Sequence, residues 1–205
     1  IRRLLPGYQQ CDMDVGEMFL NFLLHKEMKE MSGVDISHVR SKLASDKDWE
    51  DDRKRSWERW CRNWMGLRDS LYRSIQHLIR VKYIAYGDRM KTTNPFHWKE
   101  VVYNLPGTKG YDSTLPWVMK VRPDGHLASE IYCYVDDGRA TGHSPEACWA
   151  AVRRFASICT RMGIQDAARK RTSPSLTPGP WAGTVTHTDR GEVVGTVTPE
   201  KWEKT

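Results

Sequence analysis

The sequence lacks most of the features that would place it in a membrane or in an oxidising compartment. It contains no run of about 18 apolar residues, and its N-terminus lacks the apolar core of a signal peptide. Its five cysteines lie far apart, with no C-x-x-C pair and no histidine at zinc-ligand spacing. These absences argue against a transmembrane span, a disulfide framework and a zinc module. We therefore expect an intracellular protein of the cytoplasm or nucleus that is not secreted and has no membrane partner.

What the sequence does contain is the composition of a globular domain with a basic surplus. Hydrophobic residues make up 39% of the 205 residues and charged residues 28%, so the chain is expected to fold. The net charge of +6 favours a polyanion such as nucleic acid as a partner. The chain opens without Met and stops at "PEKWEKT", apparently within a helix, so we expect a fragment of a longer protein.

Strand and helix patterns alternate along the first two thirds of the sequence. The stretch from Tyr8 begins as a strand and turns at Gly16 into an apolar helical run. Residues 42–62 and 70–86 have the spacing of helices, the first charge-dense and carrying tryptophans at helical intervals. The turn formers at 123–125 predict a hairpin between "WVMKV" and "LASEIYCYVDD". Together these patterns predict a mixed α/β fold.

The last third carries the clearest local signals. Ser144 is a typical N-cap, Pro145 suits the first helical position, and Gly163 is a typical C-terminal stop, so a helix is predicted between them. Two alternating runs around residues 189–191 predict a second hairpin.

The stretch "IYCYVDDGRATG", residues 131–142, places two aspartates side by side after an apolar strand. We expect Gly138 to allow the chain to reverse there. Adjacent carboxylates repel one another, and a divalent cation with oxygen ligands would neutralise them. A solvated turn is the alternative for Asp136 and Asp137 taken alone. A metal site for phosphoryl transfer needs a further carboxylate from elsewhere, and "CDMDVGEMF" offers Asp12 and Asp14 on one face of a strand.

These two stretches resemble a known family. "YVDD" at 134–137 resembles the Tyr-x-Asp-Asp motif of reverse transcriptases, and "MDVGEMF" at 13–19 resembles their first catalytic-aspartate motif. The chain is similar to the palm of a reverse transcriptase, most of all to those of retrotransposons. The resemblance implies an α/β (α+β) polymerase palm, with an antiparallel sheet and packed helices, followed by the start of a thumb.

Three weaker motifs follow in the order of the family. "WMGLRDSLY" at 64–72 is similar to the turn and helix under the template and incoming nucleotide, with Gly66 in the turn and Leu71 where the family commonly has Pro. "MGIQDAARK" at 162–170 resembles the segment that ends in a lysine, here Lys170. "WAG" at 181–183, with Trp181 and Gly183, resembles the element that grips the primer.

The resemblance implies RNA-directed DNA polymerase activity, with an RNA or DNA template, a primer and deoxynucleoside triphosphates as partners. Asp14, Asp136 and the carbonyl of Val15 would hold two Mg²⁺ ions, with Mn²⁺ as an alternative. Asp137, the third catalytic carboxylate of the motif, would either assist them or face away. Phe19 would exclude a ribose 2′-hydroxyl by a steric clash. Tyr134 would border the primer end, and Lys170 would either protonate pyrophosphate or be a solvated lysine.

The same resemblance divides the chain. Residues 1–172 correspond to the palm, with an insertion at about 87–125, and residues 173–205 to the primer-grip hairpin and the start of the thumb. The fingers are missing, so we expect this fragment alone to be weakly active or inactive. A non-catalytic or domesticated palm remnant that binds nucleic acid is the alternative function. The sequence leaves the oligomeric state open.

Overall fold

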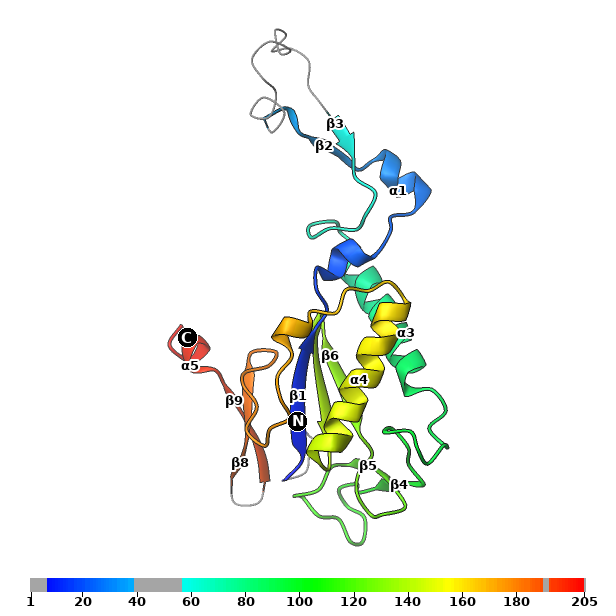
Figure 1. Ribbon diagram of the computed structural model, residues 1–205. Coiled ribbons are helices and arrows are strands. Elements are labelled where there is room, and N and C mark those ends of the chain that lie inside the picture. Colours follow the sequence, from blue (N-terminus) through cyan, green and yellow to red (C-terminus); the bar gives the residue numbers. More distant parts are fainter. Residues whose placement is uncertain (1–6, 39–56, 190–191, 205) are drawn as a thin grey trace. The chain divides into compact units, whose positions relative to one another are not determined.

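A computed structural model of the chain describes residues 7–38, 57–189 and 192–204. They form a mixed α+β fold in which the strands make small antiparallel sheets (Figure 1). The chain divides into two compact units, of which the larger takes in Ile1–Met18 and Ile75–Thr205 and the smaller Phe19–Ser74. None of the helices in the described ranges has the length and hydropathy needed to cross a membrane.

The larger unit is built on a three-stranded antiparallel sheet. Strands β1 (Gln9–Asp14), β7 (Asp137–Gly142) and β6 (Glu130–Tyr134) lie side by side in that order. Cross-strand partners point to the same face of a sheet, so the register divides the side chains into two sets. One set is apolar and buried, and includes Cys11 and Ile131.

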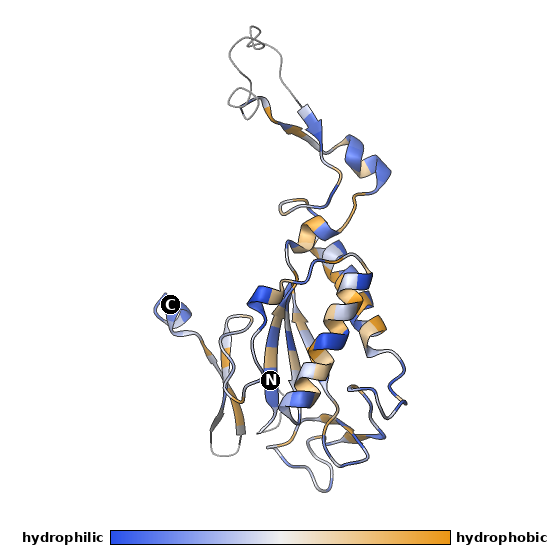
Figure 2. Cartoon of the chain, viewed as in Figure 1, coloured by the Kyte–Doolittle hydropathy of each residue, from blue (hydrophilic) through white to orange (hydrophobic). Residues whose placement is uncertain are grey.

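Helix α4 (Pro145–Arg161) packs against β1 and β7. Its buried residues are Cys148, Ala151, Val152, Phe155 and Cys159, whereas its three arginines, at 153, 154 and 161, are exposed. Hydrophilic and hydrophobic positions alternate along the helix (Figure 2). The predicted caps are confirmed: the Ser144 hydroxyl accepts a hydrogen bond from the Ala147 amide at 3.1 Å, and Gly163 has a φ of +71°. The local signals of the sequence therefore fixed both ends of this helix.

Helix α3 (Ser70–Tyr86) has the bounds that its periodicity predicted. In the larger unit it buries Leu78, Val81 and Ala85. The Arg154 guanidinium of α4 donates to the main-chain oxygen of Ala85, which ties the two helices together.

Strands β4 (Glu100–Tyr103) and β5 (Val118–Val121) form an antiparallel pair within the predicted insertion. The predicted hairpin around 123–125 forms next to its turn: Val121 and Leu127 make an antiparallel bridge, and the Ala128 amide donates to the Lys120 main-chain oxygen at 2.8 Å. The pairing does not continue into β6, which pairs with β7 instead. The chain then passes through buried residues 127–129 before β6 begins.

The predicted helical run after Gly16 is broken into the 3₁₀ helix η1 (Met18–Asn21) and helix α1 (Lys26–Glu30). In the smaller unit, strands β2 (Gly33–Asp35) and β3 (Trp57–Arg59) pair antiparallel. The helix predicted over 42–62 lies mostly outside the described residues. Its end is wrong, because residues 57–59 pair with β2 and the ladder outweighs the helical spacing of the tryptophans.

After α4 the chain returns along the outer edge of β1. Gln10 and Ser175 exchange main-chain hydrogen bonds of 2.9 Å, and the Thr172 amide donates to the Asp12 main-chain oxygen at 3.1 Å. This segment contains the 3₁₀ helix η2 (Ala168–Lys170) and covers an edge that would otherwise present unpaired backbone groups.

The predicted C-terminal hairpin is confirmed. It consists of β8 (Thr184–Asp189) and β9 (Glu192–Val197), and the short helix α5 (Pro199–Trp202) follows it.

Candidate active site

The second face of the central sheet is polar. Its side chains lie in cross-strand rows that run from the β6–β7 turn toward the far end of the sheet. In that order the rows are Asp14–Asp137–Tyr134, Asp12–Arg139–Tyr132 and Gln10–Thr141–Glu130. The first row and the turn bring together the aspartates of the two catalytic motifs that the sequence predicted.

The β6–β7 turn consists of Val135 and Asp136, since Tyr134 and Asp137 are the last cross-strand partners. Val135 has a φ of +55°, a position that type II′ hairpin turns usually give to glycine. A β-branched residue there is strained by about 1–3 kcal/mol, and such strain is typical of functional sites. The Val15 amide donates to the Asp136 main-chain oxygen at 3.0 Å, and this hydrogen bond fixes the turn against the end of β1.

Gly138 does not form the turn, which corrects the prediction. It lies in β7 opposite Met13, and a Cβ on it would come 2.8 Å from the Met13 Cγ. Glycine is needed at this position for close packing on the apolar face.

We call Asp14, Asp136 and Asp137 the acidic end of the sheet. Burial raises the pKa of Asp137, and the negative charges of Asp136 and Asp14 raise it further. The three carboxyl groups therefore lie close enough to repel one another, as expected of a cation site.

Lys170 is the cation that the structure brings to the acidic end. Its Nζ lies 2.5 Å from the Asp14 Oδ2, and this contact raises the pKa of Lys170, with a smaller contribution from Asp136. Lys170 is thus paired with a carboxylate here, and its predicted role as a proton donor to pyrophosphate stays a prediction.

In the next row, Arg139 neutralises the carboxylate of Asp12. Its side chain is 2% exposed, and its Nε and Nη2 atoms donate to the two carboxylate oxygens of Asp12 at 2.6 and 2.9 Å. It also donates to the Gly179 oxygen at 2.8 Å and the Thr186 hydroxyl at 3.2 Å, which fastens β8 to the sheet. Both carboxylate oxygens of Asp12 are thus paired with Arg139, and the role of Asp14 as a metal ligand stays a prediction.

Trp181 lies between Arg139 and the turn of the aspartates. Its ring centroid is 6.5 Å from that of Tyr134 in an edge-to-face arrangement, and the Arg139 guanidinium is 5.4 Å from it. Trp181 and Thr184 exchange main-chain hydrogen bonds around a tight turn in which Gly183 has a φ of +77°. Trp181, predicted with Gly183 to contact a primer, thus lies beside Tyr134, which was predicted to border the primer end.

Two predicted site residues belong to the smaller unit. Phe19 lies in η1 and Gly66 adopts a φ of +104° in the turn before α3. Beside that turn, the buried side chain of Asn63 donates to the Ser70 oxygen and the Ser74 hydroxyl. The roles of Phe19 and Gly66 toward a nucleotide stay predictions.

At the far end of the polar face, Glu130 is held by two cations. Arg89 Nη2 and Lys120 Nζ each lie 2.9 Å from its Oε1, and the Tyr86 hydroxyl donates to its Oε2 at 2.7 Å. Burial raises the pKa of Glu130, but these partners outweigh burial and hold the pKa below its ordinary value. We call these four residues the Glu130 network.

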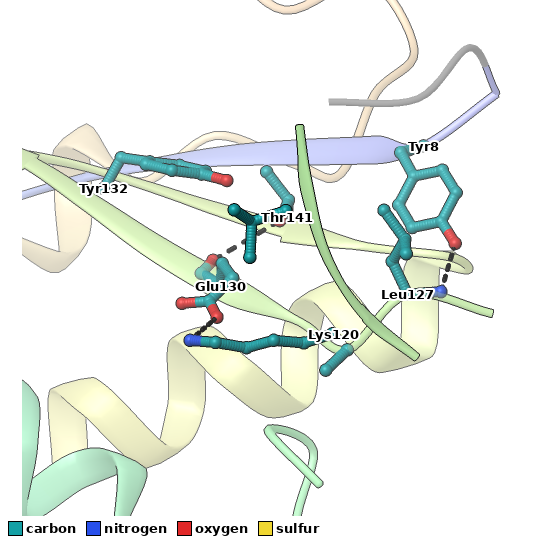
Figure 3. Close-up of a pocket in the computed structure, with 8 residues that line it drawn as sticks. Tyr8, Lys120, Leu127, Glu130, Tyr132 and Thr141 are labelled. Atoms are coloured by element: carbon teal, nitrogen blue, oxygen red, sulfur yellow. Dashed lines mark hydrogen bonds and ion pairs between the residues drawn. The ribbon is translucent and has the colours of Figure 1, made fainter. Parts of the chain in front are cut away.

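A small cavity opens beside the Glu130 network (Figure 3). It has a volume of about 120 Å³ and is lined by Tyr8, Val118, Lys120, Leu127, Ala128, Glu130, Tyr132 and Thr141. Ligand pockets usually have volumes of about 300–1,000 Å³, so this cavity is too small for a nucleotide. None of the predicted catalytic residues lines it.

The donors at the acidic end suit Mg²⁺, which prefers hard oxygen ligands and often takes few carboxylates, completing its shell with water and phosphate. Asp14 and Asp136 offer carboxylates, and Val15 offers a main-chain carbonyl. In the described ranges, no three or more His, Cys, Asp or Glu side chains are arranged to hold a metal ion together. A site here would therefore depend on a substrate for part of its ligand shell.

The sequence analysis missed Arg139 and its pairing with Asp12. The available signal was the alternation in "DGRATG", where a charged residue lies between small, buried ones in a strand. A charge at such a position is rarely buried unless it is paired.

No protein-family model matches this chain, and it matches no curated protein.

Proposed function

We propose that this chain is the palm of an RNA-directed DNA polymerase, which adds deoxynucleotides to the 3′-hydroxyl of a primer on an RNA or DNA template. The observation that carries the proposal is the cross-strand pairing of Asp14 with Asp137 beside the strained Val135–Asp136 turn. The order of the elements supports it as well: a strand, a helix, a hairpin with two aspartates, a second helix and a final hairpin follow one another as in a polymerase palm.

The chain's own residues divide the work. Asp14, Asp136 and the Val15 carbonyl would hold two Mg²⁺ ions, which when bound activate the attacking hydroxyl and neutralise the charge of the departing pyrophosphate. The Val15–Asp136 hydrogen bond fixes the distance between the two motifs. The Tyr134–Trp181 pair forms an aromatic wall beside the turn, against which a primer end would lie.

The decisive experiment is primer extension by the full-length protein, with Mg²⁺, an RNA template and a DNA primer. Asp136→Asn should lower the rate by about 10³-fold or more, because a metal-bound site supplies several kcal/mol of transition-state stabilisation. Asp88→Asn is the matched control, since Asp88 is an exposed carboxylate outside the motifs, and its Oδ1 accepts a hydrogen bond from the Met90 amide that an asparagine can keep. Equal extension by wild type and Asp136→Asn would exclude the two-metal assignment.

One observation favours the alternative, a palm remnant that binds nucleic acid without catalysis. Lys170 forms an ion pair with Asp14, and among the described residues no three His, Cys, Asp or Glu side chains are arranged to hold a metal ion. On that alternative the full-length protein binds a primer–template duplex but does not extend it, and Asp136→Asn leaves the binding unchanged.

A further inference from the structure

Lys170 reaches Asp14 because the chain on both sides of it is fixed to β1. The Ala167 amide donates to the Asp14 main-chain oxygen at 3.0 Å, and the Thr172 amide donates to the Asp12 main-chain oxygen at 3.1 Å. An ion pair between Arg171 and Asp166 closes the loop between these two attachments. The position of Lys170 is therefore built into the fold and does not depend on a chance meeting of two surface side chains.

The two partners of the Lys170–Asp14 pair differ in freedom. The Asp14 side chain is 12% exposed and lies in the sheet, whereas the Lys170 side chain is 55% exposed and has four rotatable bonds beyond its backbone. The carboxylate is thus the fixed member and the ammonium the movable one. The negative charges of Asp14 and Asp136 raise the pKa of Lys170, and the pKa of Asp137 stays raised although Lys170 lies near it, so the repulsion among the carboxylates is not fully relieved while Lys170 is in place.

We propose that Lys170 is an exchangeable counterion of Asp14 that couples cation binding to nucleotide binding. A divalent cation that approaches Asp14 must displace the ammonium, which then has no anionic partner of its own. A triphosphate bound at the acidic end offers the ammonium a new partner and leaves Asp14 to the cation. Each ligand therefore strengthens the binding of the other. This inference rests on the proposed function, because it requires that the acidic end bind a divalent cation and a nucleotide.

The coupling has a definite sign. By thermodynamic linkage, a nucleotide must tighten cation binding by the same factor by which the cation tightens nucleotide binding. Without the ammonium, the cation has no competitor for Asp14, and the nucleotide has no ammonium to draw away from it. Neutralising Lys170 should therefore tighten binding of the bare cation and reduce the coupling factor toward one. A lysine that only stabilised its loop would change neither quantity.

The test uses Mn²⁺ as the probe, because bound and free Mn²⁺ differ in their electron paramagnetic resonance signals. Mn²⁺ affinity is measured for the full-length protein as wild type, Lys170→Met and Lys170→Arg, first alone and then with a non-hydrolysable deoxynucleoside triphosphate. The nucleotide's own Mn²⁺ binding is subtracted from a protein-free titration. Lys109→Met is the matched control, since it removes one exposed lysine charge away from the acidic end. Asp14→Asn shows whether the ion is bound at this site.

We expect Lys170→Met to bind Mn²⁺ alone about 5–10-fold more tightly than wild type, at the lower end of the usual range of coupling between sites, and to lose most of the nucleotide effect. Lys170→Arg, which keeps the charge, should retain the coupling, and Lys109→Met should behave as wild type. If Lys170→Met binds Mn²⁺ as wild type does, with the same nucleotide effect, the exchange is wrong while the proposed function stands. If the wild-type chain binds no Mn²⁺ that depends on Asp14, the exchange and the metal assignment are both wrong.

Discussion

The two ends of the polar face use the same residue types to opposite effect. At the far end, Glu130 has two cations and a tyrosine hydroxyl, and its pKa is held low. At the acidic end, three carboxylates share one exposed lysine, the pKa of Asp137 is raised, and Val135 is strained. The first arrangement stabilises the sheet, whereas the second keeps repelling carboxylates and a strained residue, features that are common at functional sites.

The row of Arg139 separates the two ends, and its removal should have the largest effect on stability. Arg139→Met leaves Asp12 without its cation, and breaking a buried ion pair in this way costs about 3–5 kcal/mol. The free energy of unfolding in urea measures the loss. The double variant Arg139→Met with Asp12→Leu should recover most of it, because no unpaired charge is then left inside.

Arg122→Met is the control for this comparison, since its partner Asp124 is more exposed, with 44% of its side chain accessible. If Arg139→Met loses less than about 1 kcal/mol, as surface pairs such as that of Arg122 do, the Arg139 row does not hold the sheet together.

The Glu130 network should show the next largest effect. Glu130→Gln leaves Arg89 and Lys120 without an anion, and we expect a loss of about 2–3 kcal/mol at pH 7. Since the pKa of Glu130 is lowered in the folded state, its stabilisation is fully present above its ordinary pKa of 4.5 and is lost as the pH falls through the folded value. The gap between wild type and variant in urea unfolding should therefore be constant from pH 7 to about pH 5 and shrink below it.

Glu100→Gln, at an exposed position of β4, is the control and should follow the wild-type curve. A gap that stays constant down to pH 3 would mean that the Glu130 charge does not account for the effect.

The parts of the fold that the sequence predicted well are those with local signals. Helix α3 has the predicted bounds, α4 begins and ends at the residues chosen for its caps, and the β8–β9 hairpin forms around its turn residues. Each depends on spacing or chemistry within a few neighbouring residues. The pairing of the two aspartate motifs differs, because it joins the distant strands β1 and β7 and was predicted from the resemblance to a reverse-transcriptase palm and not from a local pattern.

The parts that the sequence did not predict depend on contacts between distant residues. The Arg139–Asp12 pair joins β7 to β1, and its contact with Trp181 joins both to the turn before β8. The role of Gly138 follows from Met13 across the sheet, and the strand at residues 57–59 follows from β2. No local pattern specifies such partners, because tertiary contacts outweigh local propensity.

The smallest expected effect separates the two ends most directly, because it has the opposite sign. Burial and the charges of Asp136 and Asp14 raise the pKa of Asp137, so its ionised form is unfavourable in the folded state at neutral pH. Asp137→Asn removes that repulsion and should raise the free energy of unfolding by roughly 0.5 kcal/mol at pH 7, a value discounted for solvent screening. The gain should disappear below about pH 3, where the wild-type carboxyl is protonated in both states. Asp124→Asn, in the turn after β5, is the comparison variant: burial raises the pKa of Asp124, but its contacts with His126 and Arg122 outweigh burial and lower it, so the amide variant should be slightly less stable than wild type. If both variants lose stability at pH 7, the acidic end is as well balanced as the Glu130 network, and its surplus of negative charge no longer argues for a bound cation.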